Sequence, residues 1–386
     1  MAGCGNEKPL GGGALVVERD TTADTLTVRN VSGSRWGDDL RLVEELRIDG
    51  DGASEASMLG KVTALNVDER GEIYLYDAML RELRAYSPDG RLLRQFGRPG
   101  EGPGEFRSVL GLAVLADGRI AVRDAARVLV FSADGESAEA WPAGAGIMLP
   151  APDMLAADTT GGVFTLVPAG AEMRDGALVF RQAYLHLDKS GAVIDSIAKP
   201  ASPDLPPPET SFSVRRLVTL SPRGALVSAV SDRYEIEVRA ADGRVLRIVR
   251  EGQSPVELGP AELAAHRSFF DEIARRNPGE RRVEMPTTKP LLRTLRVAGD
   301  GRIWVRVHTE AIVAADAPGA GSPLTARDDW AEPEVWDVFD ADGDYLGRIQ
   351  LPLGASALAM RDEVIWGTVL DGNDVPSVVR WRIAGR

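Results

Sequence analysis

The sequence predicts an all-β fold, a six-bladed β-propeller made of four-stranded antiparallel blades. Three observations predict it. Short runs rich in β-branched and aromatic residues alternate with glycine turns along most of the chain. The runs fall into groups of four that contain two tight turns each. The groups recur along the chain at a spacing typical of propeller blades.

The first tight turn of each group lies between its first two strands. It is found in "SPRGALVSAV" (Ser221 to Val230) and "AGDGRIWVRV" (Ala298 to Val307), and "DTTGGVFTLV" (Asp158 to Val167) is a weaker copy. The second turn recurs as "YSPDGRLLRQF", "FSADGESAEAW", "LDKSGAVIDSI", "RAADGRVLRIV" and "FDADGDYLGRI". Glycine is favoured at these turns because they need a positive φ angle, and Asp-Gly between β runs is a strong hairpin signal.

Five full units follow from these turns, and their residue ranges are 62–97, 109–141, 152–198, 212–250 and 291–351. A sixth unit, Ala357 to Ile383, has only three strands before the chain ends. We expect its outer strand to be "LRLVEELRI" (Leu40 to Ile48), so that an N-terminal strand closes the last blade. Closure of the ring removes exposed strand edges that would favour aggregation. The predicted organisation is a single propeller domain over residues 14–386, preceded by a flexible tether over residues 1–13.

The glycine-rich stretch "FGRPGEGPGEF" (Phe96 to Phe106) joins the fourth strand of the first unit to the first strand of the second. It lacks the Gly-Lys-Ser/Thr ending of a phosphate-binding loop and does not precede a helix. We therefore interpret it as a connection between blades and not as a phosphate site.

The segments "YSPDGRLLRQFGRPGEGPGEF" and "GLAVLADGRIAVRD" resemble the NHL-repeat family of six-bladed propellers. The resemblance is close over about residues 62–135 and fades beyond them. It implies the fold but names no activity, because the family includes scaffolds, binding proteins and a few enzymes.

Charge and cysteine content limit the partners and the location. Asp and Glu number 58 against 45 Lys and Arg, which gives a formal net charge of −13 and disfavours nucleic acid as a partner. The single cysteine, Cys4, lies in "MAGCGNEKPLGGG", which resembles the end of a bacterial lipoprotein signal. We expect a lipid on Cys4 to be the only link to a membrane and the protein to reside in the bacterial cell envelope. The alternative is a cytoplasmic protein with an incidental cysteine.

The longest insertions all lie in one class of connection. They are 97–108, 168–180, 251–290 and 308–333, each of which links the second strand to the third or one blade to the next. These connections meet at one end of a propeller, so this end is predicted to carry the function. One helix is expected near residues 260–277, with an apolar face of Leu263, Phe270, Ile273 and Ala274 and a position across the channel mouth.

Candidate binding residues are those expected to approach that mouth, where arginines would suit an anionic or peptide-like ligand. They are Arg81, Arg123, Arg127, Arg233, Tyr234, Arg275, Arg276, Arg306 and His308. Asp77, Asp124 and Asp232 follow second strands and are expected to cap backbone N–H groups. The three histidines have no metal-ligand spacing, and the aspartates of "DADGDYLG" (Asp340 to Gly347) fit an Asp-Gly hairpin better than a calcium loop.

These observations favour a binding or scaffolding protein whose ligand is a protein, a peptide or a glycan, and we expect it to be a monomer. No cofactor, metal site or catalytic residue is predicted, and an enzyme is the less favoured interpretation. Two alternatives stay open. One is a metal-dependent propeller hydrolase or lyase, such as the lactonase-like enzymes, with its site at the channel mouth, and the other is a purely structural module.

Overall fold

The computed structural model describes residues 13–50, 58–125, 127–144, 154–174, 177–201, 205, 210–276, 283–313 and 330–385. Six sheets contain four antiparallel strands each, or have four such strands as their main part. The chain is a six-bladed β-propeller. The strands of each blade are called a to d from the channel outwards.

Blades 1 to 3 follow the chain without interruption. Blade 1 is β4 (Val62–Val67), β5 (Ile73–Asp77), β6 (Glu82–Tyr86) and β7 (Leu92–Phe96). Blade 2 is β10 (Val109–Val114), β11 (Ile120–Asp124), β12 (Arg127–Phe131) and β13 (Ala138–Pro142). Blade 3 is β14 (Leu155–Ala157), β15 (Val163–Arg174), β16 (Ala177–Leu187) and β17 (Val193–Ala198).

Blades 4 and 5 carry longer insertions. Blade 4 is β18 (Arg216–Leu220), β19 (Leu226–Val230), β20 (Glu235–Arg239) and β21 (Val245–Arg250). Blade 5 is β24 (Leu292–Val297), β25 (Ile303–Val307), β28 (Val335–Phe339) and β29 (Tyr345–Gln350). The repeat units predicted from the turns therefore correspond to the observed blades.

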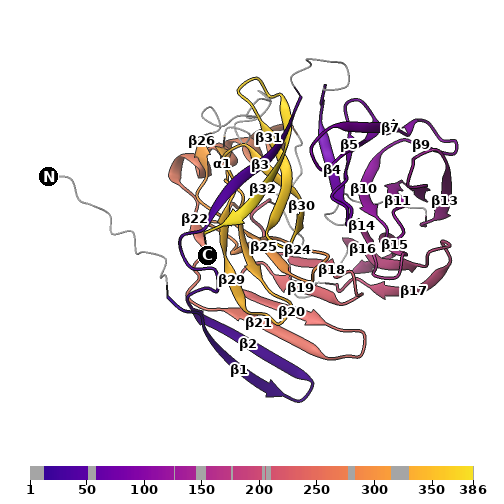
Figure 1. The fold of residues 1–386 in the computed structure, drawn as a ribbon. Coiled ribbons are helices and arrows are strands. Elements are labelled where there is room, and N and C mark those ends of the chain that lie inside the picture. The colour runs from indigo at the N-terminus through magenta and orange to yellow at the C-terminus, as the bar shows by residue number, and fades with distance from the viewer. Residues whose placement is uncertain are drawn as a thin grey trace.

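An N-terminal strand closes blade 6, as the sequence predicts. β30 (Ala355–Arg361), β31 (Val364–Leu370) and β32 (Pro376–Ala384) supply strands a to c, and β3 (Arg41–Asp49) pairs antiparallel with β32 as strand d. Figure 1 shows β3, from the start of the chain, lying beside β32 at its end. The two ends of the domain thus hold the ring together.

An N-terminal hairpin that the sequence analysis did not foresee extends blade 4. β1 (Val16–Thr22) and β2 (Thr25–Ser32) form the hairpin, and β2 pairs with β21 in parallel, so this sheet has six strands (Figure 1). Asn30 anchors it to the next blade: its side-chain amide donates to the Gly343 carbonyl at 2.9 Å, and its Oδ1 accepts the Tyr345 N–H at 2.8 Å.

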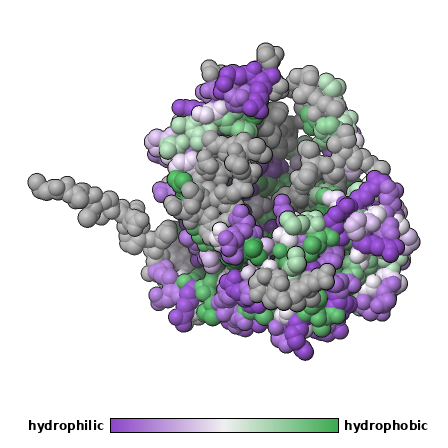
Figure 2. All heavy atoms as spheres, turned by 90° about the horizontal axis from the view of Figure 1, so that it is seen from above, coloured by the Kyte–Doolittle hydropathy of each residue, from purple (hydrophilic) through white to green (hydrophobic). Residues whose placement is uncertain are grey.

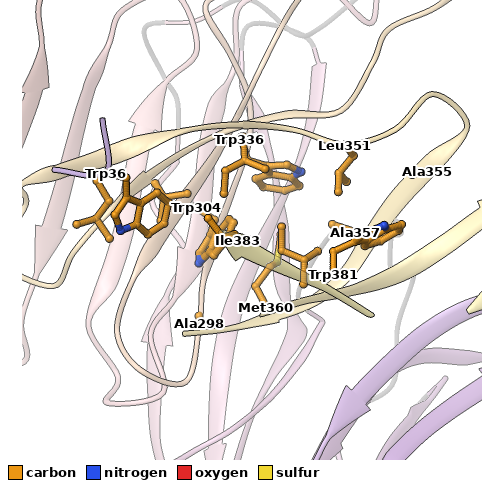
Figure 3. Close-up of a cluster of buried hydrophobic side chains, with 14 of the residues drawn as sticks. Trp36, Ala298, Trp304, Trp336, Leu351, Ala355, Ala357, Met360, Trp381 and Ile383 are labelled. Atoms are coloured by element: carbon orange, nitrogen blue, oxygen red, sulfur yellow. The ribbon is translucent and has the colours of Figure 1, made fainter. Parts of the chain in front are cut away.

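Residues 14–49, called the N-terminal strap, therefore contact three blades in turn. Between the hairpin and β3, the N–H of Trp36 donates to the Leu346 carbonyl at 2.8 Å. The Trp36 ring enters a core between blades 5 and 6 that includes Trp304, Trp336 and Trp381 (Figure 3). The strap thus ties blade 4 to blade 6 across the outside of blade 5.

The inserted elements all belong to b–c or d–a connections. They are the ribbon β8 (Arg98–Pro99) with β9 (Glu105–Phe106), the ribbon β22 (Val256–Glu257) with β23 (Thr288–Lys289), the helix α1 (Pro260–Arg276), and the ribbon β26 (Ile312–Val313) with β27 (Trp330–Ala331). The a–b and c–d connections that the structure describes are short turns. We call the end with the insertions the loop-rich end and the opposite end the turn end.

Two details differ from the sequence analysis. Residues 168–180 are not a separate loop, because β15 and β16 continue as one hairpin with an irregularity between Pro168 and Ala171. The helix is confirmed at Pro260–Arg276, but its buried side chains are Glu262 and His266, and Leu263 and Phe270 pack only partly buried. Within the described residues, no helix is long and apolar enough to span a membrane.

Candidate functional site

The loop-rich end of blades 4 and 5 gathers charged side chains beneath α1. Lys289 is fully buried on β23 and lies between two carboxylates: its Nζ is 2.9 Å from Glu262 Oε1 on the helix and 3.1 Å from Glu332 Oε1. The same Nζ donates to the Thr309 carbonyl at 2.9 Å. A buried ammonium is tolerated only when its hydrogen bonds are made, so these three contacts fix the helix over blade 5.

A small apolar cluster also packs against α1. Phe212, which precedes β18, is buried with Leu258 and Met285, and Leu263 and Phe270 of the helix pack against them. The Phe212 ring meets the rings of His266 and His308 edge-on, at centroid distances of 5.0 and 5.9 Å. The helix is therefore held partly by polar contacts, which is why apolar periodicity alone misjudged its buried face.

His308 and Glu332 form a buried pair in this network. The Nδ1 atom of His308 lies 2.9 Å from Glu332 Oε2, and its Nε2 makes no hydrogen bond with any described residue. Burial lowers the pKa of His308, although the Glu332 hydrogen bond opposes this effect. Burial alone would raise the pKa of Glu332, but the His308 hydrogen bond and the charges of His308, Lys289 and Arg293 bring it down to about 2. Near neutral pH the pair is therefore an imidazole donating from Nδ1 to a carboxylate.

A pH-dependent loss of stability follows from the lowered pKa of His308. The unfolded chain takes up a proton near pH 6.5 that the folded chain resists, so stability should fall as the pH drops below about 6.5. We expect His308→Gln to remove this component, whose slope is at most about 1.4 kcal/mol per pH unit. Urea unfolding between pH 7.5 and pH 5 measures this slope. The control variant is His186→Gln, which changes a partly exposed histidine. Equal slopes in the wild type and His308→Gln would contradict the assignment.

Arg293 and Arg306 lie close to this pair, and Arg215 lies near Arg293. Arg293 is the extra residue of a bulge in β24, between the pairs Leu292–Val307 and Thr294–Arg306, and bulges redirect side chains. Its Nη1 lies 3.3 Å from Glu332 Oε2, and its side chain is 37% exposed. Arg306 on β25 pairs with Glu334 at 2.8 Å, and burial lowers its pKa to about 10. Arg215 immediately precedes β18, the inner strand of the neighbouring blade 4. Its side chain makes no hydrogen bond or ion pair with a described residue.

Of the predicted binding residues, the structure brings only Arg306 and His308 into this network. Arg123 is buried and donates to the carbonyls of Arg127 and Ala143, so it joins two segments of blade 2. Arg81 donates to the Arg107 carbonyl at 3.2 Å. Arg233 pairs with Asp232 at the surface, and Arg275 and Arg276 pair with Glu272 at the exposed end of α1. Arg215, Arg293, Lys289 and Glu332 also belong to this site, but they carry no motif and were not predicted from the sequence.

Arg127 has a structural role that explains the glycine-rich connection. Its guanidinium donates to the carbonyls of Glu101 and Glu105, each at 2.8 Å, and to Asp124 Oδ2 at 3.2 Å. Gly97 has a φ angle of +71°, and a Cβ there would lie 2.4 Å from the Phe106 ring. "FGRPGEGPGEF" is thus a compact connection between blades 1 and 2, as the sequence predicts.

Tyr234 lies between blades 4 and 5 and is buried. Its hydroxyl donates to Asp337 Oδ2 at 2.6 Å, and Asp337 is fully buried. Arg250, Arg348 and Tyr345 also donate to this carboxylate. Asp337 and its donors thus join the outer strands of two blades.

The aspartates that follow second strands cap backbone N–H groups in two of the three predicted cases. Asp77 accepts from Gly60, Lys61, Met79 and Leu80, and Asp124 accepts from Arg107 and Ser108. In blade 4 the neighbouring Ser231 takes this role by accepting the Arg215 N–H at 3.0 Å. The prediction for Asp232 is therefore wrong by one residue.

The aspartates of "DADGDYLG" form a turn, as expected. Asp340 Oδ1 accepts the N–H groups of Asp342 and Asp344, and Asp344 pairs with Arg19 and Arg35 of the strap. No group of three or more potential metal ligands occurs within the described residues. Cys4 lies outside the described residues.

A cavity of the described structure opens at the turn end. It has a volume of about 870 Å³ and is lined by inner strands and a–b turns of all six blades. Asp68, Asp158 and Asp300 lie on its rim, but each caps backbone N–H groups of its own turn. Such a cavity has the size of a small-ligand pocket, but these three carboxylates already accept hydrogen bonds within the protein.

The loop-rich end presents a different surface. Figure 2, which views the molecule from the upper side of Figure 1, shows a face that is hollowed near its centre. Hydrophobic and hydrophilic residues are interspersed on its coloured part, without one continuous apolar patch. The mixed character of the coloured part suits a ligand with hydrogen-bonding groups better than an obligate apolar interface.

Comparison with known proteins finds similar solved structures at low sequence identity. No family model matches the chain, and no curated protein matches its sequence. A member of the DUF4221 family from Bacteroides vulgatus aligns with a TM-score of 0.49 and 10% identity, over 90% of this chain and 99% of that one. Virginiamycin B lyase from Staphylococcus aureus aligns with a TM-score of 0.41 and 10% identity, over 89% and 100% of the two chains. The resemblance to NHL repeats therefore stays a prediction.

Proposed function

We propose that this protein is a binding or scaffolding propeller of the bacterial cell envelope that recognises a protein, peptide or glycan through its loop-rich end. One observation carries the proposal: every inserted ribbon and the only helix of the described chain belong to connections at that end. Varied loops on a rigid scaffold are the usual place of recognition. The envelope location and the lipid on Cys4 belong to the same proposal.

The buried network beneath α1 supports this assignment. Lys289 holds the helix to Glu332, which lies just beyond β27 in the b–c connection of blade 5, and Phe212 supports it from blade 4. The inserted elements of blades 4 and 5 are thus fixed to one another. Preorganised loops bind with a smaller loss of conformational entropy, which favours a defined ligand.

Exchange of connections at the two ends tests the proposal. Arrays of bacterial cell-wall glycans and of peptides provide the ligand. The loop-end variant replaces residues 169–180 by an Asn-Gly turn. The matched turn-end variant replaces Asp242-Gly243 by Asn-Gly. We expect the loop-end variant to lose at least about tenfold in affinity, about 1.4 kcal/mol, and the turn-end variant to bind like the wild type. Loss in the turn-end variant alone would move the site to the turn end of the propeller.

The same experiment separates the alternatives. A purely structural module predicts that no glycan or peptide binds above background in any variant. A hydrolase or lyase predicts that a bound ligand is converted, which mass spectrometry of the incubated ligand detects. The His308–Glu332 pair is the arrangement that such an enzyme would use for proton transfer, since the carboxylate orients the imidazole.

A further inference from the structure

The charged cluster beneath α1 contains four cations and three carboxylates. Its cations are Lys289, Arg293, Arg306 and Arg215, and its carboxylates are Glu262, Glu332 and Glu334. Glu262 and Glu332 hold Lys289, Glu332 also holds Arg293, and Glu334 holds Arg306. Arg215 is left without a carboxylate among the described residues, in a chain whose net charge is −13.

The position of Arg215 is fixed although its guanidinium is not paired. Its N–H donates to Ser231 Oγ at 3.0 Å, and its carbonyl accepts the Ser231 N–H at 2.9 Å. The residue is partly buried at the loop-rich end of strand a. A partly buried cation without a counter-ion destabilises a fold, so an unpaired guanidinium held here needs another explanation.

Arg293 adds a second guanidinium nearby. It precedes Thr294 on the inner strand of blade 5, beside β18, and its bulge leaves the side chain partly exposed. Burial lowers the pKa of Arg215, and the positive charge of Arg293 lowers it further, so the two side chains repel each other. An anion between them would remove this repulsion and supply the missing acceptor.

We propose that Arg215 and Arg293 form a subsite for an oxyanion, a carboxylate or a phosphate-like group, of the ligand that binds the loop-rich end. This inference rests on the proposed function and adds the chemical class of the ligand. The planar guanidinium fork matches two oxygens of a carboxylate or phosphate, and charge-assisted hydrogen bonds of this kind are strong. Arg306 contributes positive potential, because its Nη1 pairs with Glu334 while its buried Nε has no acceptor.

Thermal unfolding of the purified full chain tests the subsite with simple anions. The probes are sodium phosphate and sodium acetate at increasing concentration, with sodium chloride at matched ionic strength as the reference. Binding to the folded state raises Tm in a saturable manner. A rise with acetate indicates a carboxylate ligand, and a rise with phosphate alone indicates a phosphate-like ligand. No rise with either anion above chloride overturns the proposal.

Variants locate the effect. Arg215→Ala and Arg293→Gln should each weaken the apparent anion affinity at least tenfold, and Arg233→Ala, which removes an exposed arginine paired with Asp232, should leave it unchanged. In chloride alone, Arg215→Ala should be as stable as the wild type or more stable, because an unpaired charge is removed. A less stable Arg215→Ala variant with an unchanged anion response would show that Arg215 has an internal partner and overturn the subsite. If these variants lose the anion response but still bind the glycan or peptide as tightly as the wild type, the anion does not bind where the ligand binds. This outcome would reject the subsite but not the proposed function.

Discussion

Truncation of residues 1–49 is expected to prevent stable folding, with a loss of more than about 5 kcal/mol, the whole stability of many domains. The truncation removes β3 and leaves the edge of β32 unpaired. It also removes Trp36 and Ile48 from the cores that join blade 6 to blades 5 and 1. Circular dichroism and guanidinium unfolding of the purified chain measure the effect.

Two shorter truncations serve as matched controls. Removal of residues 1–12 should leave the unfolding midpoint unchanged, because β1, β2, Trp36 and β3 all remain. Removal of residues 1–32 should lower the midpoint without preventing folding, since β3 remains while β2 no longer pairs with β21. A 1–49 truncation that unfolds cooperatively at the wild-type midpoint would show that β3 does not close the ring.

The fold was largely predictable because its determinants are local and repeated. Each Asp-Gly turn specifies a hairpin by itself, and the repetition of two turns per unit specifies the blade. The closing strand was predictable because the segment 40–48 resembles the strands d of other blades. The hairpin β1–β2 was not predicted, because its parallel pairing with β21 depends on contacts over more than two hundred residues, such as that of Asn30 with Gly343.

The candidate site was less predictable, because its residues act through partners from separate elements. Arg306 and His308 were placed near the mouth by their position after strand b. Lys289, Glu262 and Glu332 carry no signal in the sequence, since a lysine and two glutamates usually indicate a solvated surface. Arg123 and Arg127, which were predicted to bind a ligand, donate to backbone carbonyls in the structure.

Asp337→Asn should destabilise the protein by about 3–5 kcal/mol, because it leaves the cations Arg250 and Arg348 without their buried carboxylate. Asp337 accepts five hydrogen bonds from Tyr234, Arg250, Tyr345 and Arg348 and joins blades 4 and 5. Tyr345→Phe removes one of these bonds and should cost about 1 kcal/mol, which makes it the matched control. Urea unfolding at pH 7 measures both.

The pH dependence of this difference tests the electrostatic cause. Burial would raise the pKa of Asp337, but the hydrogen bonds of Arg348 and the charge of Arg250 outweigh burial and lower it. The stability that the ionised carboxylate provides is therefore fully present above its unfolded pKa of about 3.9 and is lost as the pH falls through its lower folded pKa. The gap between the wild type and Asp337→Asn should be constant from pH 7 to about pH 5 and should narrow below about pH 4. A gap that stays constant down to pH 3 would mean that the shape of the carboxylate, and not its charge, joins the two blades.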